Sequence, residues 1–268
     1  LKVDEMTRLL TSRSLLILRG EQTLPLLQGI VTRDVRHLEA KPSTASFILD
    51  KNGRISDEIL MRRREDELLI ECSIQRRPLL KNVLERYRLR KKVSIEESDE
   101  SVLWSEEKTE EDADQDPRLP GLGWRVYRRA NGEKEGDGEY REKRYSLGVG
   151  EGEELIGLLP WHSNGDLLSQ VSTNKGCYVG QELTARTATQ GMIRRRLVPF
   201  TTESTVSGDV HHPDGKKVGK IVASSSTRGL VMISFSSIDN DIRSSEGIPI
   251  KPFLPDWMKE IDLSKVNV

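Results

Sequence analysis

The sequence predicts an α+β protein that ends in a separate β domain. Over the first hundred residues, strand-like runs and two helical patterns follow in the order strand, helix, hairpin, strand, helix, strand, which favours a largely antiparallel sheet. After residue 196, only short strand-like runs with turn residues between them remain, which is typical of a small barrel. The expected divisions are an N-terminal α+β region, an acidic linker, a second α+β region and a C-terminal β domain: 1–104, 105–118, 119–196 and 197–268.

The N-terminal region is predicted to open with a strand over 12–20 and a short helix over 23–30. Asn52-Gly53 supplies the positive φ angles of a tight hairpin turn between two strands. A later helix presents an apolar stripe that includes Leu80 and Leu84. The remaining expected elements are the hairpin strands 47–49 and 55–61, a strand at 68–72, the helix at 76–89, and strands at 93–95 and 102–104.

Two polar stretches interrupt the middle of the chain. Residues 105–118 are acidic and lack apolar periodicity, so a mobile, solvated linker is expected. Residues 130–143 are rich in Gly, Glu and Lys and are predicted to be a second polar insertion after a strand at 123–128. Trp257 is expected to pack the C-terminal tail onto the body. The strands expected in the β domain are 197–200, 217–223 and 230–235.

Composition and charge argue against several classes of protein. Charged residues make up 32% of the 268 residues, yet the net charge is −1, so no global attraction to nucleic acid or anionic membrane is indicated. No apolar run approaches the roughly 20 residues of a membrane-spanning helix. The basic run 194–196 is interpreted as a solvated edge, and 86–92 as a helix end packed by Tyr87 and Leu89. Because the sequence begins at Leu1 and not Met, a mature or trimmed form is expected.

Residues 175–182, Lys-Gly-Cys-Tyr-Val-Gly-Gln-Glu, are the strongest candidate for chemistry. Gly176 and Gly180 bracket Cys177, and residues 181–186 are good helix formers. Cys177 is therefore expected in a loop before a helix N-terminus, where the helix dipole and Lys175 favour the thiolate. The alternative is a small buried thiol in a structural turn. Cys72 lies inside an apolar run and is predicted to be a core residue.

A metal centre at Cys177 would need ligands from outside the chain. Tetrahedral iron–sulfur and zinc sites use about four ligands. The chain has only two cysteines, no Cys-x-x-Cys, and four histidines without ligand spacing to Cys177. Two separated cysteines also indicate a reducing compartment. Gln181 and Glu182 are expected to bind amides at the helix start or to hold Arg186, and not to act as a general base.

The segment Lys-Gly-Cys-Tyr-x-Gly-Gln-Glu resembles the signature of the YgfZ-type family of folate-binding, aminomethyltransferase-like proteins, which support iron–sulfur cluster assembly. The continuation Leu-Thr-Ala-Arg-Thr looks most like the mitochondrial branch. The resemblance implies a three-part fold, with two interleaved α/β subdomains around antiparallel sheets and a C-terminal β-barrel-like domain. It covers nearly the whole chain through the segments 27–35, 49–57, 116–118, 160–166 and 191–197.

That branch is similar to late-acting assembly factors for mitochondrial [4Fe-4S] proteins. The resemblance therefore implies the mitochondrial matrix, support of haem biosynthesis, and a non-enzymatic role. It further implies that Cys177 shares an iron–sulfur cluster, of the [2Fe-2S] type, with an A-type iron–sulfur carrier protein. The residues expected to support the loop are those of the motif: Lys175, Gly176, Tyr178, Gly180, Gln181, Glu182 and Arg186.

Two alternative functions stay open on the sequence. The first is a tetrahydrofolate-dependent aminomethyl transferase, with Asp34 and Asp57 as the candidate folate cleft. Arg33 and His162 stand where the family usually has Asn and Glu, and an arginine offers only donors to a pterin edge, so both speak against tetrahydrofolate. The second is an RNA-modification-related binding module, which the near-neutral net charge disfavours.

Overall fold

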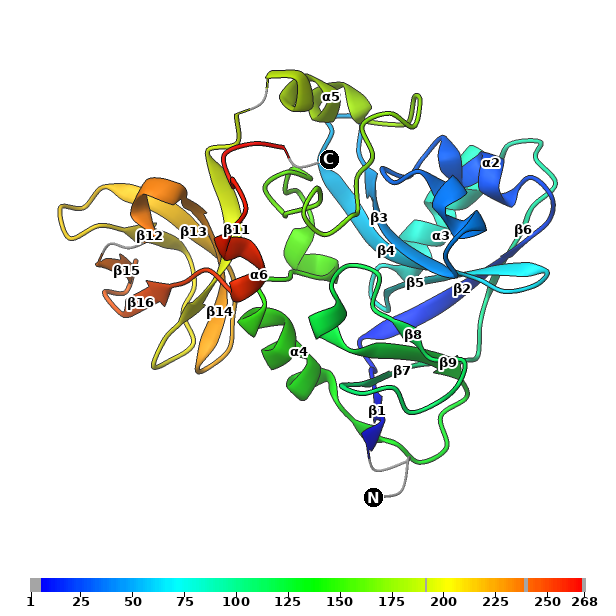
Figure 1. Ribbon diagram of the computed structural model, residues 1–268, viewed down its shortest axis with the longest axis horizontal. Coiled ribbons are helices and arrows are strands. Elements are labelled where there is room, and N and C mark those ends of the chain that lie inside the picture. The colour runs from blue at the N-terminus through cyan, green and yellow to red at the C-terminus, as the bar shows by residue number, and fades with distance from the viewer. Residues whose placement is uncertain (1–5, 191, 239–240, 267–268) are drawn as a thin grey trace.

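A computed structural model of the chain describes residues 6–190, 192–238 and 241–266. The chain forms three lobes: an N-terminal sheet, a second sheet, and a C-terminal barrel on the opposite side of the molecule (Figure 1). The predicted α+β class with a closing β-barrel is confirmed.

The N-terminal lobe is a five-stranded antiparallel sheet in the order β3-β4-β5-β2-β6. Its core cluster joins Leu16 and Ile70 of the strands to Leu27 and Leu80 of the helices, so two helices cover one face. The sequence pattern had predicted its strands and both helices, but not the 3-10 turn η1 (Val35–Glu39). The predicted elements are β2 (Arg13–Arg19), α2 (Thr23–Gln28), β3 (Ser43–Leu49), β4 (Ile55–Arg63), β5 (Glu67–Ser73), α3 (Arg77–Arg88) and β6 (Ser94–Glu97).

The second sheet is interleaved with the first along the chain. Its order is β10-β1-β7-β9-β8, so the most N-terminal strand lies between strands from much later in the sequence. This confirms the interleaving that the family resemblance implied. The elements are β1 (Arg8–Leu9), β7 (Ser101–Ser105), β8 (Asp114–Gln115), the 3-10 turn η2 (Pro120–Leu122), β9 (Trp124–Arg128) and β10 (Lys134–Glu135).

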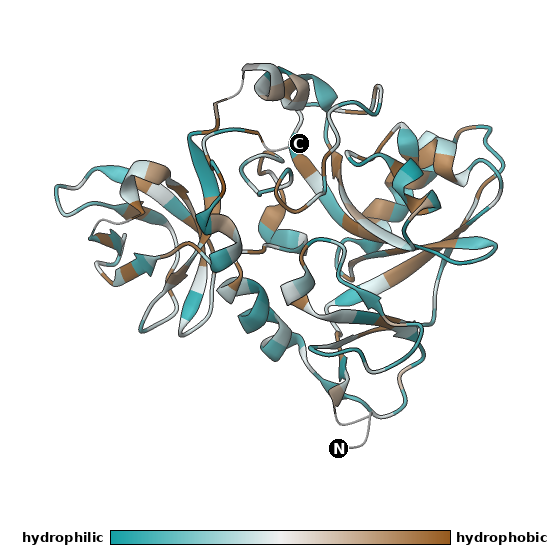
Figure 2. Cartoon of the chain, viewed as in Figure 1, coloured by the Kyte–Doolittle hydropathy of each residue, from teal (hydrophilic) through white to brown (hydrophobic). Residues whose placement is uncertain are grey.

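Both polar stretches are more structured than the sequence suggested. Residues 105–118 are not a solvated linker throughout, because β8 pairs with β9 and both Asp116 and Arg118 are buried. Residues 130–143 lead into α4 (Asp137–Ser146), which is largely hydrophilic (Figure 2). Its buried side consists of Tyr140, Arg144 and Tyr145, so the aliphatic periodicity that reveals most helices is absent.

The C-terminal lobe is a closed barrel in the order β11-β14-β13-β12-β15-β16. Trp257 packs the tail onto the body as predicted, since its indole Nε1 donates to the Leu147 carbonyl at 2.9 Å. The elements of this lobe are β11 (Arg195–Thr201), β12 (Asp209–His211), β13 (Lys217–Ser224), β14 (Arg228–Ser234), η4 (Phe235–Ser237), β15 (Ile242–Ser244), β16 (Pro249–Pro252) and α6 (Asp256–Lys259).

Two surface interpretations from the sequence were wrong. Arg196 is buried, and its guanidinium makes two 2.7 Å bonds to the Asp166 carboxylate, whereas Arg194 and Arg195 are exposed as expected. Leu89 is 77% exposed and does not pack the end of α3. The inward side chains Leu80 and Leu84 attach that helix instead.

Candidate functional site

Cys177 is exposed on a loop that ends where α5 (Gln181–Gln190) begins, at the top of Figure 1. The loop lies beside the turn that joins β3 to β4. This confirms the predicted loop before a helix and makes the sulfur accessible to a partner. Cys72 is 1% exposed in β5, where burial raises the pKa of its thiol to about 11, so it is a core residue as expected.

Lys175 fastens the Cys177 loop to the body. Its ammonium donates to the backbone carbonyls of Gln28 and Val31, both at 2.6 Å, and lies 4.9 Å from the centre of the Tyr178 ring. Burial lowers the pKa of Lys175 to about 8. The sequence suggested that Lys175 adds a positive charge near the thiol, and the structure turns its ammonium into the protein, toward the end of α2.

The Gln28 side chain also binds the Cys177 loop to the body, and no sequence pattern had singled out this residue. Its Nε2 donates to the Lys175 carbonyl at 2.9 Å and to Asp34 at 3.2 Å. Its Oε1 accepts from the Val35 amide at 3.0 Å. One amide side chain therefore links the loop to the segment after α2.

Gly180 lets the loop approach the hairpin closely. Its φ is +76°, and a Cβ at this position would lie 2.4 Å from the carbonyl oxygen of Asp50. Gly176 also has a positive φ, of +91°, but no other group lies within 4 Å of a Cβ built there. Glycine is therefore required at position 180 by both its positive φ and the close approach of Asp50, and at position 176 by its positive φ alone.

The polar residues of the motif have the roles that the sequence predicted. Gln181 Oε1 accepts from the Tyr178 amide at 3.0 Å at the start of α5. Glu182 pairs with Arg186 one turn later at 2.8 Å, and both side chains are mostly exposed. An exposed pair of this kind contributes little to stability.

The two candidate folate residues, Asp34 and Asp57, form ion pairs with different arginines. Asp34 caps η1 and pairs with Arg36 at 2.5 Å, and hydrogen bonds from Arg36 hold the pKa of Asp34 at about 2. Asp57 is 2% exposed in β4 and pairs with Arg76 at 3.1 Å. Burial raises the pKa of Asp57, and its Oδ2 has no hydrogen-bond partner among the described residues. Neither carboxylate is the solvated surface group that is the default for aspartate.

A buried ion network joins the lobes, and sequence reasoning missed it. Arg118 lies 3.1 Å from Glu58 of β4, and 2.8 Å from both Asp116 and Glu151. Arg13 of β2 lies 3.1 Å from Glu58. Charged residues inside strand-like runs were the signal that could have revealed it. The network also includes Glu71, Arg125, Tyr127, Tyr140 and Arg144.

Within the described ranges, no group of three or more His, Cys, Asp or Glu side chains is arranged to hold a metal ion. In the same part of the chain, no helix is long and apolar enough to cross a membrane.

Comparison with known proteins gives three results. The family described as CAF17, C-terminal beta-barrel domain, matches residues 194–260. Among curated proteins, the chain is 30% identical over 298 residues to the human "Iron-sulfur cluster assembly factor IBA57, mitochondrial", covering 92% of this chain and 84% of that protein. The mouse protein of the same name is 29% identical over 300 residues, with the same coverage.

Among solved structures, the glycine cleavage system aminomethyltransferase T from Bartonella henselae superimposes with a TM-score of 0.73. The match covers 97% of this chain and 87% of that one at 10% sequence identity. The likeness establishes a shared fold and, at this identity, nothing about activity.

Proposed function

Because the chain belongs to the IBA57 family of mitochondrial iron–sulfur cluster assembly factors, we propose that Cys177 is the residue through which it performs this role. In this proposal the thiolate binds one iron of a [2Fe-2S] cluster that an A-type carrier protein holds by the remaining ligands. The transfer would take place in the mitochondrial matrix, and the clients would be [4Fe-4S] proteins. The observation that carries the proposal is the exposure of Cys177 on a loop whose neighbours are held firmly.

The geometry of the loop suits a shared ligand. Lys175 and Gly180 fix the backbone on both sides, so the thiol is presented without a large entropic cost on binding. The space around Gly176 is open, which leaves room for a second protein to approach. Since a [2Fe-2S] cluster takes about four thiolates, one from this chain leaves the others to the carrier.

The test is anaerobic cluster reconstitution with an A-type carrier, followed by visible absorption, circular dichroism and size-exclusion chromatography. We expect Cys177→Ala to lose both the shared-cluster spectrum and co-elution with the carrier. Cys72→Ala is the matched control, because it removes the other cysteine from the core and should leave both signals intact. An unchanged spectrum in Cys177→Ala would rule out the ligand role.

Tetrahydrofolate-dependent one-carbon transfer is a second candidate, and the observation that favours it is Asp57. A buried carboxyl with an unpartnered oxygen and a raised pKa is suited to a polar ligand edge. Arg33 and His162 speak against it, as the sequence indicated. Calorimetric titration with tetrahydrofolate separates the two, since stoichiometric binding that Asp57→Asn abolishes would support the transferase.

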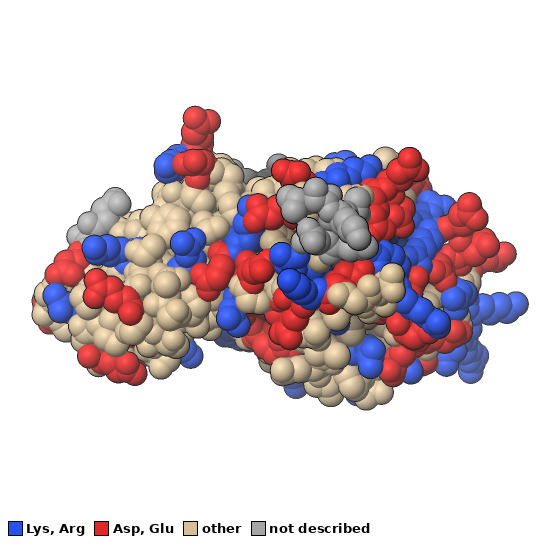
Figure 3. Space-filling view, turned by 90° about the horizontal axis from the view of Figure 1, so that it is seen from below, with Lys and Arg blue, Asp and Glu red and all other residues tan. Residues whose placement is uncertain are grey.

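RNA binding has less support. Basic and acidic side chains are interspersed over the face shown in Figure 3, so that face presents no continuous basic surface of the kind that binds a phosphate backbone.

A further inference from the structure

A cavity of about 470 Å³ lies between the segment leading into β3 and the segment around β8. Arg33, His37 and Lys41 line it from the first segment, and Asp114 and Gln115 from the second. The cavity is distinct from the Cys177 loop, and neither Asp34 nor Asp57 lines it. Its size is within the roughly 300–1,000 Å³ usual for small-molecule sites.

Three basic residues of this cavity form no ion pair. Among the described residues, Arg33, His37 and Lys41 have no carboxylate within ion-pairing distance, whereas Arg118, which also lines the cavity, is fully paired. Within the described part of the chain, the Arg33 guanidinium makes one long bond, from Nη1 to the Val171 carbonyl at 3.4 Å, and its buried Nε has no hydrogen-bond partner. The Asp34 carboxylate, which Arg36 already pairs, is the charge partner of Arg33 and only partly offsets the cost of burying its guanidinium. A half-buried guanidinium with an unpartnered Nε is costly, so this arrangement favours an anion in the cavity.

The acidic residues of the same cavity are already paired. Asp116 lies 2.8 Å from Arg118, and Asp114 lies 2.7 Å from Arg62. These pairs cancel the negative charge of the wall, so the unpaired charge that faces the cavity is positive.

Neutral polar side chains line the same cavity as the basic residues. Ser43 and Thr44 at the start of β3, with Gln115 opposite, line the cavity, and their side chains make no hydrogen bond with the described residues. A few convergent polar groups in a concave site are what fixes the orientation of a small ligand.

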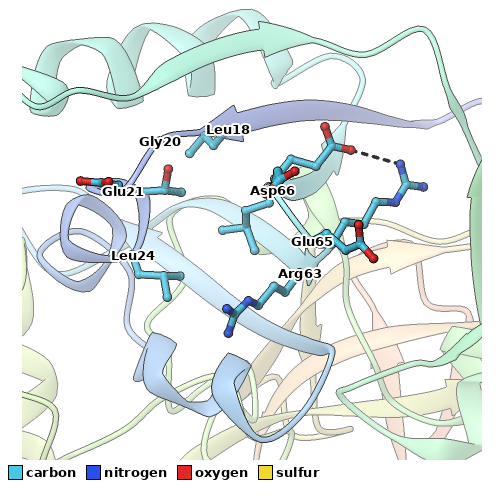
Figure 4. A pocket seen from close by; sticks show the side chains of 11 residues that line it. Leu18, Gly20, Glu21, Leu24, Arg63, Glu65 and Asp66 are labelled. Atoms are coloured by element: carbon cyan, nitrogen blue, oxygen red, sulfur yellow. Dashed lines mark hydrogen bonds and ion pairs between the residues drawn. The ribbon is translucent and has the colours of Figure 1, made fainter.

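A second cavity, shown in Figure 4, differs from the first in having more acidic than basic residues in its wall. It has about 410 Å³ and lies between the end of β2, the start of α2 and the β4–β5 turn. Glu21, Glu65 and Asp66 line it with Arg63, and its other arginine, Arg64, pairs with Glu67 at 3.3 Å. The excess of basic over acidic side chains at the Arg33 cavity is therefore absent from this second cavity.

We propose that the cavity lined by Arg33, His37 and Lys41 binds a small organic anion through a phosphate or a pair of carboxylates. Arg33 and Lys41 contact the anionic group as cations, and neutral His37 with the hydroxyls of Ser43 and Thr44 adds hydrogen-bond donors. This site is independent of the cluster function proposed for Cys177.

The experiment is calorimetric titration of the full chain with pyrophosphate and with citrate, at low and at raised ionic strength. We expect saturable binding that weakens with salt, and the tighter of the two probes identifies the anionic group as phosphate or carboxylate. Lys41→Gln and Arg33→Gln should each weaken binding roughly tenfold, the size of one lost charge-assisted hydrogen bond. Lys41 is exposed, so its variant tests the site even if Arg33→Gln fails to fold.

The matched control is Arg63→Gln, which removes one exposed positive charge at the other cavity, a charge that forms no ion pair with the residues the structure describes. It should leave the affinity for both probes unchanged, as should Cys177→Ala. Three results would overturn the proposal: no saturable binding of either probe at millimolar concentration, unchanged affinity in Lys41→Gln, or an equal loss in Arg63→Gln.

Discussion

At the scale of the residue, Lys175 explains how the reactive loop is held. Its two 2.6 Å bonds reach carbonyls at the end of α2 and just beyond it, so one side chain stabilises the loop on which Cys177 lies. Gln28 returns a bond to the Lys175 carbonyl, which makes the contact reciprocal.

We predict that Lys175→Met weakens cluster sharing with the carrier and lowers the free energy of unfolding by about 1–3 kcal/mol, the cost of leaving buried carbonyls unpaired. Cluster spectra and urea denaturation measure the two effects. Lys51→Met is the control, because Lys51 is exposed in the hairpin turn. Equal cluster spectra and equal free energies of unfolding in the two variants would show that the hydrogen bonds of Lys175 to Gln28 and Val31 are dispensable.

The lowered pKa of Lys175 adds a dependence on pH. The folded pKa of about 8 lies below the ordinary 10.5, so the unfolded chain binds more protons between these values. The free energy of unfolding should therefore rise from pH 8 to pH 10.5 in the wild type relative to Lys175→Met. Denaturation curves at three pH values in this window measure the difference, and parallel pH profiles of the two proteins would contradict the assignment.

At the scale of the element, the start of α5 rests on the β3–β4 turn through Gly180. The backbone carbonyl of Asp50 lies where a side chain at Gly180 would begin, and a backbone atom cannot move aside cheaply. The hairpin thus determines how α5 and the Cys177 loop are oriented.

Gly180→Ala should destabilise the protein more than Gly176→Ala. Both substitutions force a non-glycine residue into a positive φ, which costs about 1–2 kcal/mol. Only the first adds a steric clash, so its additional loss isolates the contact with the hairpin. Thermal unfolding of the two variants tests this, and equal losses would mean that the loop relaxes without cost.

At the scale of the whole molecule, the buried ions around Arg118 join the two sheets. Arg118 contacts carboxylates from both lobes, and neighbouring arginines hold the pKa of Glu151 well below its usual range. Such a network specifies how the lobes meet, because each member is stable only when all of its partners are present.

Arg118→Met should lower the free energy of unfolding by about 3–5 kcal/mol, because it leaves buried carboxylates without a counter-charge. Arg129→Met is the control, since its pair with Asp99 is largely exposed and contributes little. Guanidinium denaturation compares them. A loss in Arg118→Met as small as in the control would show that the network does not hold the lobes together.

Local pattern was enough to predict the two helices of the first lobe, a hairpin turn at Asn52-Gly53, the final barrel and a loop at Cys177 before a helix. Each depends on residues close together in the chain, where periodicity and turn chemistry act. Of the two positive φ angles expected in the hairpin turn, only the one at Gly53 is present, and the exposure of Cys177 was left open by the sequence. The direction of Lys175, the buried pair of Arg196 with Asp166 and the network at Arg118 were decided by the tertiary structure alone. Their partners lie far away in sequence, up to 147 residues for Lys175 and Gln28. In the sequence, a charged side chain that will be buried cannot be told from a solvated one, because its counter-charge is distant along the chain. Only the packed structure brings the two groups together.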